Sequence, residues 1–373
     1  MKITDVRLLT HERPFPAPLG PPLSRLDLLT IATDEGIEGH TFAGAPGEDI
    51  AGPLVRQVKP MLIGQNPLDI GRIWALTGRR GLPASLQGAV DVALWDIAGK
   101  AAGLPVHRLL GTVRDRVPAY TSSWVHARAQ DYVDEALAYK EQGIQGHKLH
   151  PLTQLRTFRN ADVPVSADIE LCQQLRAAVG DFFPLFLDSA WAYTYGEAVR
   201  VGLAISELEY QWYEDPLPAD DLYGYVRLKQ QLSIPIMATE ITGGGLTALA
   251  PWVVERATDF LRGDVVLKGG ITGMLKIAHL AEAFHLGCEV HDAYNSLNNL
   301  ASLHLIMAIP NCVWFEVLVP HRPGRYDLDH LSYGITEPIA IDGEGFASLP
   351  GRPGLGIDVD WDLLRSGTSA ELA

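Results

Sequence analysis

Two patterns of hydrophobic and polar residues follow one another in the first third of the chain. Residues 3–42 alternate between apolar and polar positions, and the stretch LDLLTIATDEGIEGHTFA reverses at DEG (34–36), which predicts an antiparallel hairpin. From 49 to 110 the apolar residues recur at helical spacing instead, and Gly103 follows the last of them as a stop signal. We therefore expect this part to combine an antiparallel sheet with helices.

From about residue 117 onward, short apolar strands alternate with amphipathic segments. The expected strands are VPAYTS, QGHKLH, PLFLD, QWYE, PIMATE, DVVL, CEVH and CVWFE. Because parallel strands need crossover helices, eight such units predict an α/β fold, a (β/α)8 barrel of the TIM type. The strand ends are evenly spaced except for one long step, which holds a loop insertion at 151–164.

Ionisable side chains end every strand from the second to the eighth. They are Lys148 and His150, Asp188, Glu214, Glu240, Asp264, His291 and Glu316. The carboxyl ends of barrel strands form the catalytic face, so these groups converge on one mouth. Converging carboxylates repel one another in a cleft of low dielectric unless a cation is bound.

Three of the carboxylates, Asp188, Glu214 and Glu240, end consecutive strands and are expected to lie side by side. Hard oxygen ligands in this number suit Mg²⁺, which keeps further positions open for substrate or water. The alternative is a set of helix caps and ion pairs with Lys or Arg. The barrel arrangement favours the metal.

Two further pairs are candidates for acid–base chemistry. Asp264 and His291 end neighbouring strands, and a carboxylate beside an imidazole makes it a general base or acid; the alternative is a buried His with an ordinary partner. Lys148 and His150 stand two apart and share a face of one strand. Two nearby cations lower each other's pKa, so His150, if it is the working group of this pair, is expected to be neutral near pH 7.

Composition excludes several classes of partner. The 373 residues are 47% hydrophobic and carry a net charge of −15, which opposes contact with nucleic acid or an anionic membrane. No apolar run is long enough to span a membrane, and MKITDVRLLTHER lacks the apolar segment of a signal peptide. The three widely spaced cysteines lie in apolar segments and are expected to be reduced, so we expect a cytoplasmic protein.

The chain resembles the mandelate racemase/muconate lactonizing enzyme subgroup of the enolase superfamily over nearly its full length. The resemblance rests on AVDVALWDIAGKAAGLPVHRLLG (89–111), on LD, YEDP, ATE, GDVVLKGGITG and VH in that order, and on PGLGI near the end. It implies an α+β capping domain at 1–115, a modified barrel at 116–339 and a segment, 340–373, that returns to the cap. It also implies a homo-oligomer.

The same resemblance implies the chemistry. One Mg²⁺ would be bound by the three carboxylates, and a proton α to the carboxylate of a small substrate would be abstracted through an enediolate. Glu316 matches the position that hydrogen-bonds the substrate carboxylate opposite the metal, and a protonated Glu316 would serve as the donor. The sequence departs from the family at His150, where a second lysine is usual, and at Ala190, where Asn is frequent.

We expect a lyase that dehydrates an acid sugar to a 2-keto-3-deoxy acid. A racemase, epimerase or cycloisomerase is the alternative, and a metal-binding homologue without turnover is a third possibility. Specificity is expected in the loops 14–24 and 151–164. Lys268 is expected to be structural, and several polar side chains suit a polyol: Ser122, Ser123, Trp124, Tyr193, Asn295 and Asn298.

Overall fold

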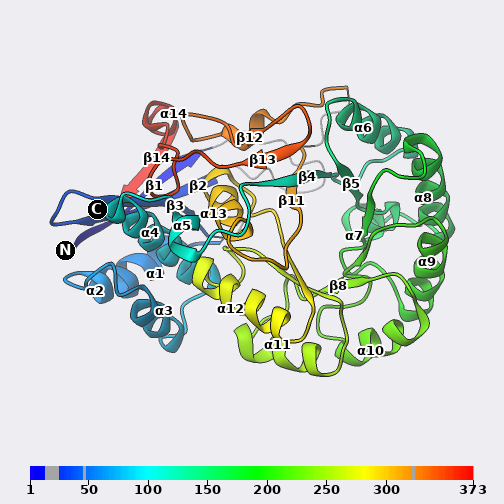
Figure 1. Ribbon diagram of the computed structural model, residues 1–373, viewed down its shortest axis with the longest axis horizontal. Coiled ribbons are helices and arrows are strands. Elements are labelled where there is room, and N and C mark those ends of the chain that lie inside the picture. Colours follow the sequence, from blue (N-terminus) through cyan, green and yellow to red (C-terminus); the bar gives the residue numbers. More distant parts are fainter. Residues whose placement is uncertain (13–24, 45–47, 321–323, 373) are drawn as a thin grey trace.

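A four-stranded antiparallel sheet joins the two ends of the chain. The computed structural model describes residues 1–12, 25–44, 48–320 and 324–372. The strand order is β14-β1-β2-β3, with β1 Ile3–Glu12, β2 Arg25–Thr33, β3 Glu38–Ala43 and β14 Thr368–Leu372. The predicted hairpin is thus confirmed as β2 and β3. The termini lie close together on this sheet (Figure 1).

Helices of the capping part cover one side of this sheet. They are α1 Ala51–Pro53, α2 Lys59–Leu62, α3 Ile70–Arg79, α4 Ala84–Ala102 and α5 Val106–Leu110. The long helix α4 ends where the sequence predicts, because Gly103 takes a left-handed conformation with a φ of 68° that favours glycine.

Eight parallel strands form the barrel and pair in chain order from β4 to β10. They are β4 Arg116–Ser122, β5 Gly146–Leu149, β6 Leu185–Asp188, β7 Tyr213–Glu214, β8 Ile236–Ala238, β9 Phe260–Gly263, β10 Gly287–Val290 and β11 Phe315–Leu318. β11 pairs in parallel with β4, and the amide of Cys288 in β10 donates to the carbonyl of Asn311, just before β11, at 2.8 Å. The predicted barrel is confirmed.

Helices surround the barrel strands in Figure 1. They are α6 Ala129–Glu141, α7 Leu155–Arg159, α8 Val165–Val179, α9 Tyr195–Glu207, α10 Leu222–Gln231, α11 Gly245–Val254, α12 Gly270–Ala283 and α13 Ser296–Ile306. Apolar side chains of these helices pack on the strands, as the helical spacing of the sequence requires.

Two local predictions were wrong. The sixth strand is β9 and precedes Asp264, whereas DVVL (264–267) forms a turn, because Oδ1 of Asp264 accepts hydrogen bonds from the amides of Val266 and Leu267, both at 2.7 Å. The insertion 151–164 is partly helical, because it contains a short 3-10 helix and α7. Nε of Arg156 in α7 donates to the carbonyl of Val163 near the end of the insertion at 2.7 Å.

The last segment of the chain contacts both parts of the molecule. β13 Phe346–Ser348 pairs with barrel strand β4 and with β12 Ala340–Ile341, whereas α14 Trp361–Ser366 leads to β14 in the capping sheet. The domain boundaries after residues 115 and 339 stay a prediction.

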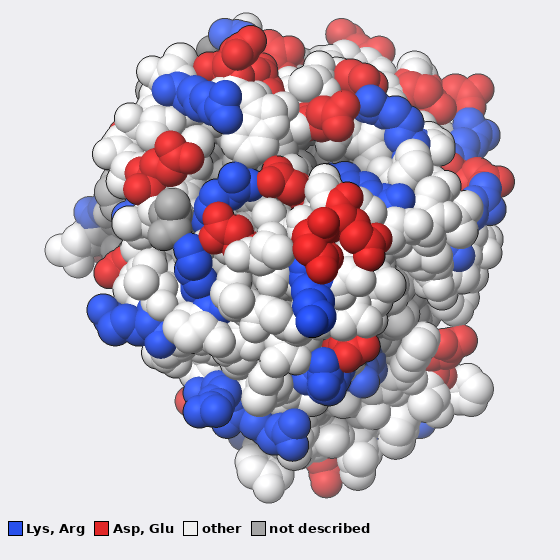
Figure 2. All heavy atoms as spheres, turned by 90° about the vertical axis from the view of Figure 1, so that its left-hand side faces the viewer, with Lys and Arg blue, Asp and Glu red and all other residues white. Residues whose placement is uncertain are grey.

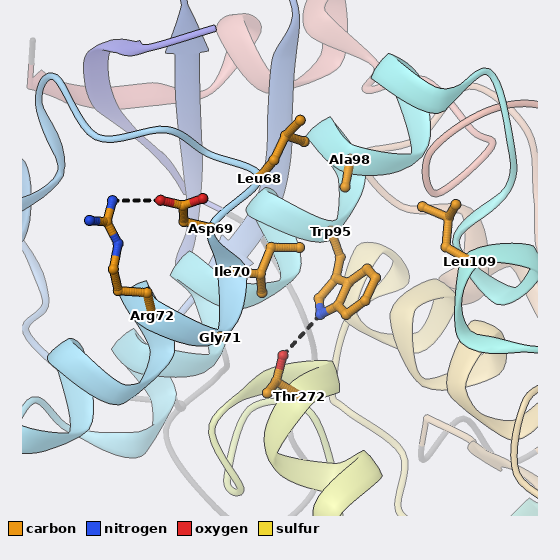
Figure 3. Close-up of a pocket in the computed structure, with 9 residues that line it drawn as sticks. All are labelled: Leu68, Asp69, Ile70, Gly71, Arg72, Trp95, Ala98, Leu109 and Thr272. Carbon is orange, nitrogen blue, oxygen red and sulfur yellow. Dashed lines mark hydrogen bonds and ion pairs between the residues drawn. The ribbon is translucent and has the colours of Figure 1, made fainter.

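The cap sits tightly on the barrel through α4. A Cβ at Gly88 would lie 2.2 Å from the carbonyl oxygen of Val265, so only glycine allows α4 to approach the turn after β9. Farther along α4, the indole of Trp95 donates to Thr272 of α12 at 3.0 Å, beside a cavity of about 720 Å³ (Figure 3). These contacts hold the cap over the strand ends.

The base of the barrel interior is aromatic, with Tyr120, Phe186 and Trp212 packed together around Met237. On the outer surface of the capping side, charges of both signs are interspersed (Figure 2). Among the described residues no helix is both long and apolar enough to cross a membrane.

Cys172, Cys288 and Cys312 are buried free thiols, as expected. The cytoplasmic location of the protein stays a prediction.

Candidate active site

The three predicted metal ligands converge at the mouth of the barrel. Asp188 ends β6, Glu214 ends β7, and Glu240 stands two residues after β8. All three are buried, and one carboxylate oxygen from each lies within 4.8 Å of the others. Burial and the charges of Asp188 and Glu214 raise the pKa of Glu240. Such a donor set fits Mg²⁺, because a bound cation offsets the repulsion that this arrangement creates.

Unusual backbone conformations occur beside the charged side chains of the mouth. Ala190, Asp215, Thr239 and Tyr294 all have a positive φ, at 42°, 41°, 87° and 66°. Each stands within three residues of a carboxylate or imidazole of the mouth. Such strain is rare outside glycine, and it is typical of functional sites.

The predicted dyad is present. Nδ1 of His291 lies 3.0 Å from Oδ2 of Asp264, and Nε2 lies on the side of the triad, 3.6 Å from Oε1 of Glu240. Burial lowers the pKa of His291, but the carboxylates of Glu240 and Glu316 and the hydrogen bond to Asp264 outweigh it and raise that pKa to about 10. A cation bound to Glu240 would offset much of the effect of this carboxylate on the imidazole. The pKa of His291 would then fall towards the range in which an imidazole acts as a base.

Lys148 and His150 both reach the mouth, as their spacing predicts. Nζ of Lys148 lies 3.0 Å from Oδ2 of Asp188, 3.0 Å from Oε2 of Glu214 and 2.7 Å from Oε1 of Glu316. Nε2 of His150 lies 3.2 Å from Oδ2 of Asp188. The second strand therefore points its two basic groups at the carboxylates.

The surroundings of His150 oppose the expected neutral imidazole. Burial lowers its pKa and so does Lys148, but the charge of Asp188 and its hydrogen bond outweigh both, so the pKa of His150 is raised. Both ring nitrogens face oxygen acceptors, since Nδ1 approaches the carbonyl of Ser123 and Nε2 approaches Asp188. This geometry favours the imidazolium.

The expected protonated Glu316 was also wrong. Burial raises the pKa of Glu316, but Arg262 and Lys148 outweigh it and hold this pKa well below its usual range. Oε2 accepts a hydrogen bond from Nη2 of Arg262 and another from the amide of Asp292, at 2.9 Å. Glu316 is thus a carboxylate in this arrangement and has no proton to donate.

Sequence reasoning missed two groups of the site. Arg262 is fully buried, and its Nε lies 2.6 Å from Oε1 of Glu214; the misplaced sixth strand hid it, although an arginine in the apolar run DFLRGD was the available signal. Asp215, in YEDP, is a further buried carboxylate. Burial and the charges of Glu240, Asp188 and Glu214 raise its pKa well above the usual range.

Lys268 lies at the edge of the mouth. Its Nζ donates to the carbonyl of Thr242 at 2.8 Å, and burial lowers its pKa to about 8. Through this bond it holds the segment that follows Glu240, which agrees with a structural role.

Two of the polar side chains expected to suit a polyol are engaged elsewhere. The hydroxyl of Tyr193 donates to Asp168 at 2.8 Å, and Asn298 bonds to Thr41 and to the carbonyl of Phe42 in the cap. The expected specificity loop 14–24 lies outside the described residues.

Comparisons with known proteins agree with this architecture. The model of the mandelate racemase/muconate lactonizing enzyme N-terminal domain matches residues 22–111, and that of the enolase C-terminal domain-like family matches 131–363. The crystal structure of D-glucarate dehydratase from Agrobacterium tumefaciens complexed with magnesium is 32% identical, with a TM-score of 0.89, over 99% of this chain and 100% of that one.

Curated relatives show the same similarity. L-talarate/galactarate dehydratase of Salmonella typhimurium is 30% identical over 84% of this chain and 77% of its own length. D-galactarolactone cycloisomerase of Agrobacterium fabrum is 28% identical over 98% of both chains. Several further relatives are also acid-sugar dehydratases.

Proposed function

Because the chain belongs to the mandelate racemase/muconate lactonizing enzyme family of the enolase superfamily, we propose that it dehydrates an acid sugar to a 2-keto-3-deoxy acid in a Mg²⁺-dependent reaction. One observation carries the proposal: Nε2 of His291, held by Asp264, lies on the side of the carboxylate triad. A substrate carboxylate bound at the triad would then present its α-carbon to this nitrogen. The dehydratases among the relatives support the choice of substrate class.

Asp188, Glu214 and Glu240 would hold the cation. When bound, Mg²⁺ supplies positive charge where negative charge develops on the substrate carboxylate. Lys148 lies against two of these carboxylates and stays cationic, since the carboxylates around it outweigh burial and raise its pKa well above the usual range. Its charge adds to the stabilisation of the developing negative charge.

His291 would carry the proton. Its Nε2 takes the proton from C2 as the C2–H bond breaks, while Asp264 binds the proton on Nδ1 and stabilises the imidazolium. The same imidazolium then protonates the 3-hydroxyl group as the C3–O bond breaks, which releases water. The resulting enol tautomerises to the 2-keto-3-deoxy acid, so all atoms balance without a redox partner.

Dehydration is favoured over racemisation because the second-strand side offers no free base. Racemisation needs competent groups on both faces of the α-carbon, whereas Lys148 and His150 both pair with Asp188 and both have a raised pKa. His150 still reaches the mouth, and one relative is a cycloisomerase. A racemase, epimerase or cycloisomerase is therefore the alternative function. The homo-oligomeric state of the protein stays a prediction.

The test is to incubate the purified full chain with Mg²⁺ and a panel of acid sugars and to measure 2-keto acid formation. We expect at least one substrate to react, with activity abolished by EDTA and restored by Mg²⁺. His291→Asn should be inactive, whereas a matched change at the exposed His279 on α12, His279→Asn, should leave turnover unchanged. Exchange of the α-proton in D₂O without 2-keto acid would instead favour the alternative.

A further inference from the structure

Arg262 spans the interior of the barrel beneath the mouth. It stands on β9, yet it contacts Glu214 on β7 and Glu316 on β11, each two strands away. Its side chain is fully buried, as are both carboxylates. A buried guanidinium that joins a proposed metal ligand to the glutamate opposite it needs an explanation beyond stability.

Lys148 completes a closed ring of ion pairs with these three groups. Arg262 contacts Oε1 of Glu214, and Lys148 contacts the other oxygen, Oε2, at 3.0 Å. In Glu316 the order is reversed: Arg262 contacts Oε2, and Lys148 contacts Oε1 at 2.7 Å. Each carboxylate oxygen thus has a cationic nitrogen beside it, although the contact between Arg262 and Oε1 of Glu214 is an ion pair without hydrogen-bond geometry.

The shape of arginine suits this arrangement. The guanidinium is planar and presents Nε and Nη2 in a fixed fork, so it can contact two carboxylates at once. A lysine carries the same charge at a single point and cannot replace the fork. Tyr120 adds a contact, since its hydroxyl accepts from Nη2 at 3.2 Å.

We propose that Arg262 is a positioning residue that holds Glu214 in place for the cation. The inference rests on the proposed function only in that the triad of Asp188, Glu214 and Glu240 binds Mg²⁺. Groups that orient metal ligands change metal affinity by about 10- to 100-fold when they are replaced.

A purely electrostatic role predicts the opposite sign. Removing a positive charge 2.6 Å from Glu214 would leave that carboxylate more negative and tighten cation binding. The direction of the change in Mg²⁺ affinity therefore separates the two explanations.

The experiment is calorimetric titration of Mg²⁺ into the full-length protein, without substrate. We expect Arg262→Gln and Arg262→Lys each to weaken binding by about 10- to 100-fold. Arg176 on α8 is the matched control, because it is also buried but, within the described part of the chain, donates its hydrogen bonds to backbone carbonyls, among them those of Leu208 and Gly180. Arg176→Met should lower the melting temperature and leave Mg²⁺ affinity within about twofold of the wild type, since it orients no ligand.

Equal or tighter Mg²⁺ binding by folded Arg262→Gln would overturn the inference. If that variant does not fold, Arg262→Lys decides, because wild-type affinity in the lysine variant would show that charge alone suffices. A wild-type protein that converts no acid sugar would reject the proposed function, yet the Mg²⁺ titrations would still test the role of Arg262.

Discussion

Replacing Asp264 by Asn should invert the tautomer of His291. Oδ1 of Asp264 accepts the amides of Val266 and Leu267, both at 2.7 Å, while Oδ2 faces Nδ1 of His291 at 3.0 Å. An Asn keeps its single carbonyl oxygen on the two amides, because the turn needs both bonds. Its NH₂ group must then donate to Nδ1, which forces the remaining imidazole proton onto Nε2.

The expected decrease in rate for Asp264→Asn follows from the loss of His291 as a general base. A proton on Nε2 removes the lone pair that faces the substrate, and a positioned general base contributes about 10²- to 10⁴-fold to the rate. At about 1.36 kcal/mol per factor of ten, the loss corresponds to about 3 to 5 kcal/mol of transition-state stabilisation. Steady-state 2-keto acid formation measures the rate, and ¹⁵N NMR of the ring reports the tautomer without any substrate.

A matched control exists far from the mouth. Oδ1 of the exposed Asp342 accepts the amides of Glu344 and Phe346 at 2.9 and 3.0 Å, a turn like that of Asp264. Asp342→Asn should retain full activity. An Asp264→Asn protein with a rate within tenfold of the wild type, or with the proton still on Nδ1, would refute the reasoning.

Three other outcomes are expected. Asp188→Asn should weaken Mg²⁺ binding and abolish turnover while the fold persists. A crystal structure with Mg²⁺ should show the ligand oxygens about 2.0–2.1 Å from the ion, and much longer distances would reject the triad as the metal site. In His291→Asn, exchange of the α-proton in D₂O should be lost; stereospecific exchange that survives there and vanishes in His150→Ala would establish a second base and favour the epimerase or racemase. Burial lowers the pKa of His304 to about 3, so the unfolded state binds more protons between about pH 3 and 6.5, and stability falls as the pH drops through that window. His304→Gln should flatten the slope of unfolding free energy against pH by about 1.4 kcal/mol per unit, measured by urea denaturation; an unchanged slope would contradict this.

The barrel and most of its mouth could be predicted from local pattern. Alternating apolar residues mark the strands, and helical spacing marks the helices. The carboxyl ends of parallel strands meet at one face of the barrel independently of the loop conformations. That is why Asp188, Glu214 and Glu240 were found together with the pair of Asp264 and His291. The turn 264–267 was misassigned because apolar residues follow Asp264, while the hydrogen bonds of its side chain end the strand.

The sequence by itself determined which ionisable groups stand at the strand ends, because that depends on the order of residues along each strand. Only the tertiary structure decided which of them pair. Arg262 meets Glu214 and Glu316 across two strands on either side, a distance set by closure of the barrel. The protonation state of a buried ionisable group depends on the groups that pair with it rather than on residue type alone, because neighbouring charges shift its pKa. Glu316 is therefore a carboxylate, and the pKa of His150 is raised rather than lowered, contrary to what their sequence positions predict.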